Sequence, residues 1–262
     1  TQDLGTAKQR LDDFPKIGGM VYTVGNEQDY HFQVLFNILK RLGYKWSKNL
    51  FHLSYGMVDL PSGKMKSREG KVIDADDLVF ELIDSVKKTS KNLGKLENNN
   101  NVIAEDTYRK IALGALKYFI LKVDPKKRIL FNPEESIDLT GNTGPFIQYT
   151  YARIQSILNK IEKLETTMIS DYKLNEKEKE TIKSINRYND ILKEAKNELS
   201  PAIICNYLYD LVKTFNSLYQ NHNILNAETP DSIVIRTQIS FLTSKVISNI
   251  SELLGIELPD KM

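Results

Sequence analysis

The apolar residues of this chain follow two different periodicities, and the change between them limits the folds it can adopt. Before residue 75, short apolar runs at 20–24 and 50–58 flank an amphipathic stretch at 29–42. From residue 105 onward, apolar residues recur every three to four positions. The first pattern predicts two parallel strands joined by a helix, and the second predicts a helical bundle. We therefore expect a partial Rossmann-type α/β piece followed by an all-α domain.

Glycine and proline residues mark the ends of the predicted α/β elements. Gly18-Gly19 precedes the first strand, Gly43 ends the helix, and Pro61-Ser62-Gly63 follows the second strand. Strand, helix, strand is the unit of a parallel sheet covered by helices. A complete doubly wound sheet needs more strands than these, so we expect the sequence to begin within such a fold.

Helical periodicity and caps predict the elements of the second part. We expect a helix at 74–90, with Asp74 as its N-cap, and then about five more. Those five are expected at 105–122, from 144, at 174–198, from 200 and at 231–254. The polar stretch that ends at Asn98–Asn101 predicts a domain boundary, which divides the chain into 1–103 and 104–262.

Composition excludes several classes of protein. Lys and Arg (36) nearly balance Asp and Glu (34), so binding of a polyanion requires a local basic patch. No apolar run approaches the roughly 20 residues of a membrane span. A single cysteine, Cys205, excludes an intramolecular disulfide and a thiolate zinc cluster, and it fits the cytoplasm. The three histidines are too scattered for a recognisable metal motif.

The most informative segment for function is residues 63–70, with the sequence Gly-Lys-Met-Lys-Ser-Arg-Glu-Gly. Three cations and a hydroxyl between glycines suit a loop that closes on a polyphosphate and neutralises transferring phosphoryl oxygens. Taken alone, the eight residues are better explained as a solvated basic turn.

With its neighbours, this loop resembles the signature loop of class I aminoacyl-tRNA synthetases, in the variant of the arginyl-tRNA synthetases. Lys64 stands at the first lysine of the signature, and Ser67 stands where the second would be. The resemblance includes five further segments, at 1–5, 24–32, 142–153, 215–219 and 254–262. It also covers 114–119, although Gly114 replaces an aspartate and Lys117 an arginine of the family pattern.

The resemblance implies roles for individual residues. The loop residues implied to act on the triphosphate are Lys64, Lys66, Ser67 and Arg68. Those implied to bind arginine are Asp3 and Gln28, and those implied at the nucleotide are Gly25, His31 and Met57. Those implied to contact tRNA are Tyr149, Arg153, Tyr219 and Met262. Without the resemblance, Asp3 is a surface acid, His31 a hydrogen-bonded structural histidine, and each tyrosine a packing residue. For Tyr118, Phe119 and Phe146 we expect packing in the core.

The implied function is that of an arginine–tRNA ligase, which joins arginine to its tRNA through arginyl-adenylate. The implied partners are arginine, ATP with Mg²⁺, and arginine tRNA, with no structural metal, DNA or membrane and a monomeric parent protein. The His-x-Gly-His motif that binds ATP in this family does not occur in the sequence. We therefore expect the C-terminal part of such an enzyme, inactive alone but able to bind tRNA.

Two other functions are considered. A stand-alone, non-catalytic tRNA-binding module is the main alternative. A helical interaction protein that uses no nucleotide is disfavoured, because it leaves the segment at 63–70 unexplained.

Overall fold

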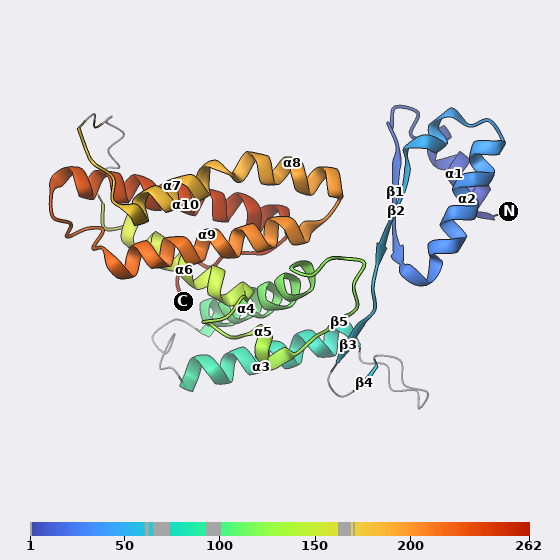
Figure 1. Cartoon of the computed structure of the whole chain (residues 1–262). Helices are drawn as coiled ribbons and strands as arrows, with labels where there is room; N and C mark the ends of the chain where they lie inside the picture. The colour runs from blue at the N-terminus through green and yellow to red at the C-terminus, as the bar shows by residue number, and fades with distance from the viewer. Residues whose placement is uncertain (1, 61–62, 65–73, 93–100, 162–168, 170) are drawn as a thin grey trace. The chain divides into compact units, whose positions relative to one another are not determined.

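The computed structural model describes residues 2–60, 63–64, 74–92, 101–161, 169 and 171–262 (Figure 1). These residues form two compact units. Unit 1 comprises Thr1–Asp59 and Pro125–Leu130, and unit 2 comprises Leu60–Asp124 and Phe131–Met262. Most of the basic loop and most of the predicted polar boundary lie outside the described residues. The boundary at residue 103 therefore stays a prediction.

Unit 1 contains the predicted strand–helix–strand. Its elements are α1 (Gln2–Asp13), β1 (Met20–Gly25), η1 (Asn26–Gln28), α2 (Asp29–Arg41), η2 (Lys45–Asn49), β2 (Leu50–Tyr55), the start of β3 (Val58–Leu60) and β5 (Ile129–Leu130). β1 pairs with β2 in parallel, from Met20 opposite Leu50 to Gly25 opposite Tyr55. Phe32, Leu35 and Leu39 of α2 are buried in the small core of this unit. The predicted parallel unit and the burial of its helix are confirmed.

Helix α1 was not among the predicted elements. Its inward face consists only of Leu4, Ala7 and Leu11, of which Ala7 is fully buried. Such a narrow stripe, with Gly5 in the first turn, gives a weak helical signal. Packing against α2 stabilises this helix more than its own sequence does.

The second predicted strand is shorter than expected, because the backbone changes partner at Gly56. β2 ends at Tyr55, and the Gly56 amide donates a 2.7 Å hydrogen bond to the Pro125 carbonyl. A side chain at Gly56 would overlap the backbone of Lys127, so only glycine allows this approach. The chain resumes in β3, where Val58 pairs in parallel with Ile129.

Unit 2 is helical. Its elements are β4 (Gly63–Lys64), α3 (Ala75–Asn92), α4 (Asn101–Leu121), α5 (Pro133–Ser136), α6 (Gly144–Leu158), α7 (Glu176–Asn186), α8 (Tyr188–Glu198), α9 (Pro201–Asn221) and α10 (Pro230–Leu253). The predicted N-cap of α3 is confirmed, since Asp74 Oδ1 accepts a 3.0 Å hydrogen bond from the Asp76 amide. No described helix has both the length and the apolar character to cross a bilayer.

The single helix predicted at 174–198 is wrong, because two helices, α7 and α8, meet at Arg187. The Ser184 carbonyl accepts hydrogen bonds from the Tyr207 hydroxyl (2.9 Å) and from the Arg187 amide (3.2 Å). The second of these spans three residues, as in a tighter 3₁₀ turn. A side chain from α9 therefore holds the turn that separates the two helices.

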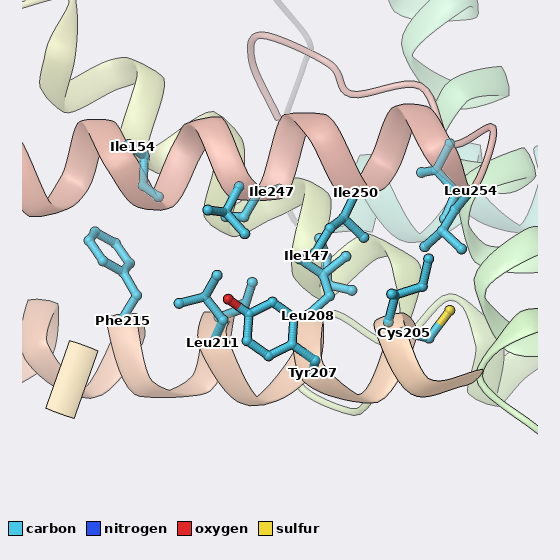
Figure 2. Packing of buried hydrophobic residues seen from close by; sticks show 14 of the residues in the cluster. Ile147, Ile154, Cys205, Tyr207, Leu208, Leu211, Phe215, Ile247, Ile250 and Leu254 are labelled. Atoms are coloured by element: carbon cyan, nitrogen blue, oxygen red, sulfur yellow. The ribbon is translucent and has the colours of Figure 1, made fainter. Parts of the chain in front are cut away.

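The core of unit 2 lies between α6, α9 and α10 (Figure 2). Its fully or almost fully buried members include Ile147, Ile154, Leu208, Leu211, Phe215, Ile247 and Ile250. Tyr118 of α4 is fully buried, and Phe119 is 7% exposed, so their predicted packing roles are confirmed. The Tyr118 hydroxyl donates to Asn142 Oδ1 at 2.7 Å and lies 3.0 Å from the Cys205 carbonyl. These contacts tie α4 to α9 and to the segment before α6.

Candidate functional sites

Three residues predicted to contact tRNA meet on adjacent helices of unit 2. Tyr149 and Arg153 lie one turn apart on α6, and Tyr219 lies near the end of α9. The Arg153 guanidinium carbon is 4.8 Å from the centre of the Tyr149 ring and 4.9 Å from that of Tyr219. Both distances are within the range of cation–π attraction. We call Tyr149, Arg153 and Tyr219 the Arg153 cluster.

A chain of hydrogen bonds through buried polar side chains positions the Arg153 guanidinium. Arg153 Nη1 donates a 2.6 Å hydrogen bond to Oδ1 of Asn216, which is 7% exposed. Asn216 Nδ2 donates in turn to Thr150 Oγ1 at 2.8 Å, and that hydroxyl donates to the Phe146 carbonyl at 3.0 Å. The sequence alone predicted no role for Asn216 or Thr150. Both residues lie inside segments that resemble the family, at 215–219 and 142–153. That resemblance is the one sequence feature that could have indicated a role for them.

The chemistry of the Arg153 cluster suits an unstacked base. Tyr219 is 38% exposed, and Tyr149 and Arg153 are partly buried. Aromatic rings and a planar guanidinium offer faces for base stacking, and the guanidinium also binds phosphate. The guanidinium already contacts both rings, which reduces the ordering that a ligand has to impose.

The segment after α10 is fixed against α4 and α6. Ile256 and Pro259 are buried, and the Glu257 carbonyl accepts a 2.7 Å hydrogen bond from Gln148 Nε2. Lys117 donates to the Gly255 carbonyl. The partly buried Met262 ends this anchored segment and is not among the residues that hold the Arg153 guanidinium.

The two departures from the family pattern in α4 both lie at contacts with other parts of unit 2. A side chain at Gly114 would overlap the amide of Gln148, which is fully buried and donates to the Lys110 carbonyl at 3.0 Å. Glycine at 114 therefore makes room for the glutamine that holds Glu257. Lys117, in place of arginine, reaches the carbonyl at the start of the same terminal segment.

In unit 1, two residues assigned to different ligands are in contact. Asp3 lies in the first turn of α1 and His31 in the first turn of α2. Asp3 Oδ2 is 3.1 Å from His31 Nε2, and the side chains are 60% and 49% exposed. Gly25 ends β1, and Gln28 is an exposed residue directly before α2. Ligands of parallel sheets collect at this end of the strands.

A tyrosine and an arginine lie beside this pair. The Arg10 guanidinium carbon is 5.6 Å from the centre of the Tyr22 ring. Burial raises the pKa of Tyr22, and the positive charge of Arg10 opposes that rise. The negative charge of Asp3 adds a smaller increase to the Tyr22 pKa, so Asp3 is close enough to Tyr22 to interact with it electrostatically.

Of the other predicted site residues, the structure describes only Met57 and the backbone of Lys64. Met57 lies between β2 and β3 and is 38% exposed. The Lys64 backbone forms part of β4, but its side chain and all of Lys66, Ser67 and Arg68 lie outside the described residues. Within the described part of the chain, no three His, Cys, Asp or Glu side chains are grouped to hold a metal ion.

Two family models match consecutive parts of the chain. The model described as "tRNA synthetases class I (R), catalytic domain" matches residues 1–132. The model described as "DALR anticodon binding domain" matches residues 147–262. The first match contains all of unit 1, and the second contains most of α6 and all of α7 to α10.

Similar proteins agree with both matches. A curated arginine–tRNA ligase of Flavobacterium psychrophilum is 58% identical over all 262 residues, and one of Parabacteroides distasonis is 51% identical. The chain spans 43% and 44% of the length of these two relatives.

Solved structures of low identity show the same fold. Thermus thermophilus arginyl-tRNA synthetase superposes with a TM-score of 0.85 at 24% identity, over 95% of this chain and 42% of that one. The Plasmodium falciparum enzyme gives 0.79 at 21% identity, over 99% of this chain and 44% of the other.

Proposed function

Because the chain belongs to the class I arginyl-tRNA synthetases, we propose that it is the part of an arginine–tRNA ligase that binds the tRNA anticodon and supplies half of the adenylation site. The Arg153 cluster is the observation that carries this proposal, since residues from two helices form one stacking platform. The proposed substrates are arginine, ATP with Mg²⁺, and arginine tRNA. The lone buried cysteine favours a reducing compartment such as the cytoplasm.

The helical domain is proposed to recognise splayed anticodon bases. A base stacks on the open part of a Tyr149 or Tyr219 ring, while the guanidinium supplies hydrogen bonds to a base edge or phosphate. Met262 is proposed to pack against a base through its flexible thioether. Anchoring of the segment at 255–259 supports that role, because an anchored tail brings its last residues to a limited region.

The α/β unit is proposed to position arginine and ATP. Asp3 binds the guanidinium of arginine, with Gln28 beside it, and Gly25, His31 and Met57 lie near the nucleotide. Lys64, Lys66 and Arg68, with the Ser67 hydroxyl, stabilise the pentacoordinate α-phosphate and the leaving pyrophosphate. The arginine carboxylate attacks the α-phosphate directly, so no covalent enzyme intermediate forms.

Alone, the 262-residue chain is proposed to bind tRNA without forming arginyl-adenylate, because its sequence contains no His-x-Gly-His. Arginine-dependent exchange of pyrophosphate into ATP, measured with tRNA present, tests this. Exchange above background would contradict it. A protein that naturally consists of this chain alone would be a non-catalytic tRNA-binding module.

Titration of the purified chain with arginine tRNA and with a noncognate tRNA tests the anticodon role. Tighter binding of arginine tRNA is expected. Arg153→Ala and Tyr219→Ala should each weaken it by about 1–3 kcal/mol, the range for loss of one stacked base. Lys193→Ala, which removes an exposed positive charge from α8, is the control and should have little effect. Equal affinity for both tRNAs, with neither variant weakened, would refute the role.

A further inference from the structure

The contact between Asp3 and His31 changes the role that His31 is expected to have. The packing of α1 against α2 places a carboxylate assigned to arginine 3.1 Å from an imidazole assigned to the nucleotide. An ionised carboxylate only accepts hydrogen bonds, so His31 Nε2 carries the proton and donates to Asp3 Oδ2. We propose that His31 is a positioning residue for Asp3, which orients this carboxylate toward the guanidinium of arginine. The inference rests on the proposed function.

The imidazole is held in place on the side of α2. Its ring lies edge-on to Phe32, with the ring centres 5.5 Å apart and the planes at 88°. Phe32 is 8% exposed and packs in turn against Tyr22 and His52, with ring centres 5.0 and 4.4 Å away. His31 is therefore packed against an aromatic group, whereas the Asp3 side chain is mostly exposed in the first turn of α1.

A fixed donor matters because the guanidinium binds a carboxylate through two parallel hydrogen bonds in one plane. The Asp3 side chain is 60% exposed, so without a partner it samples several rotamers. One hydrogen bond to Oδ2 selects the plane of the carboxylate and leaves Oδ1 and a second lone pair of Oδ2 for the ligand. Binding of arginine then requires less ordering of the site.

The positioning role and a nucleotide role predict different kinetics. In the complete ligase, His31→Leu should raise the KM for arginine by about 10-fold, as expected for loss of one hydrogen bond to a charged group. The KM for ATP should stay within about twofold. His31→Gln keeps a donor near the position of Nε2 and should restore the arginine KM to within about threefold of the unsubstituted enzyme.

A double substitution tests whether His31 acts through Asp3. If it does, His31→Leu should have little further effect in an enzyme that already carries Asp3→Asn, because the two changes remove one function. Tyr30→Ala is the control, since this neighbouring side chain is 78% exposed. It should change neither KM. His31 is about half exposed, so the melting temperature should be unaffected by its substitution.

Arginine-dependent pyrophosphate exchange is the assay for every variant. An increase in the KM for ATP alone in His31→Leu, or an unchanged arginine KM, would overturn the inference and leave the proposed function intact. Full additivity with Asp3→Asn would also overturn it. Absence of arginine-dependent exchange by the unsubstituted ligase would instead refute the proposed function.

Discussion

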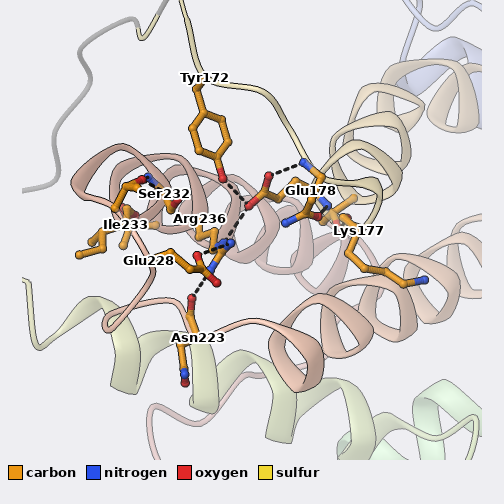
Figure 3. Close-up of polar contacts among 12 residues, drawn as sticks. Tyr172, Lys177, Glu178, Asn223, Glu228, Ser232, Ile233 and Arg236 are labelled. Atoms are coloured by element: carbon orange, nitrogen blue, oxygen red, sulfur yellow. Dashed lines mark hydrogen bonds and ion pairs between the residues drawn. The ribbon is translucent and has the colours of Figure 1, made fainter.

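A buried ion pair joins the start of α7 to α10, and its removal should destabilise the helical unit strongly (Figure 3). Arg236 Nε donates to Glu178 Oε1 at 2.7 Å, and the two side chains are 3% and 0% exposed. Glu178 also accepts hydrogen bonds from the Tyr172 hydroxyl and the Asn175 amide, both at 2.9 Å. Its Oε2 thereby completes the capping box of α7 with Asn175.

Arg236 has two further partners. Its Nη1 donates to the Asn223 carbonyl at 2.7 Å, and its Nη2 lies 2.9 Å from Oε2 of Glu228. Burial disfavours the charge of Arg236, but the hydrogen bonds to Glu178 and Glu228 outweigh burial and raise its pKa. Glu228 is 64% exposed and therefore screened by water, so the partner that matters for stability is Glu178.

Arg236→Met should lower the free energy of unfolding by about 3 kcal/mol. Breaking a buried pair by removing one partner costs roughly 3–5 kcal/mol, because a charge stays buried without its counterion. The lower end applies because Tyr172 and the Asn175 amide still donate to Glu178. Arg236→Met combined with Glu178→Leu should cost clearly less than the sum of the single changes, since no buried charge remains.

Urea denaturation followed by far-ultraviolet circular dichroism measures these changes. Lys179→Met is the matched control, because it breaks the exposed pair with Glu176 on the same helix and should leave the denaturation midpoint almost unchanged. A loss below about 1 kcal/mol for Arg236→Met, or additive effects in the double variant, would refute the reasoning about a buried charge.

Four further outcomes are expected. Burial raises the pKa of the Cys205 thiol to about 12, so iodoacetamide at pH 8 should alkylate it only after unfolding, and alkylation of the native chain would contradict its burial. The stability linked to this neutral thiol is complete below its unfolded pKa of roughly 8.5 and should be lost as the pH rises toward about 12. In the complete ligase, Lys64→Ala should slow arginine activation by about 10²–10³-fold while tRNA affinity changes little, and activation within about twofold of normal would remove the loop from catalysis. Deletion of Lys261 and Met262 should weaken tRNA binding at unchanged melting temperature, and unchanged affinity would leave the anticodon role to the tyrosines.

Local signals in the sequence determined the order of most elements. The strands β1 and β2, the helix between them and the long helices of unit 2 each have an apolar period that suits one secondary structure. Gly43 and Gly255 follow the ends of α2 and α10, and Asp74 caps α3, because these are properties of a few adjacent residues. The segments that resemble one family are likewise contiguous, so the sequence was sufficient to identify the family.

Contacts between residues distant in the sequence decided where some elements end and which polar side chains pair. The break between α7 and α8 depends on the Tyr207 hydroxyl, and the end of β2 depends on the Pro125 carbonyl. Glu178 and Arg236 are 58 positions apart, so no local sequence pattern could predict that they pair. The same applies to Asp3 and His31, which are 28 residues apart and were assigned to different ligands. A sequence pattern reports which face of an element is apolar, whereas the partner of a polar side chain is set by the packing of whole elements.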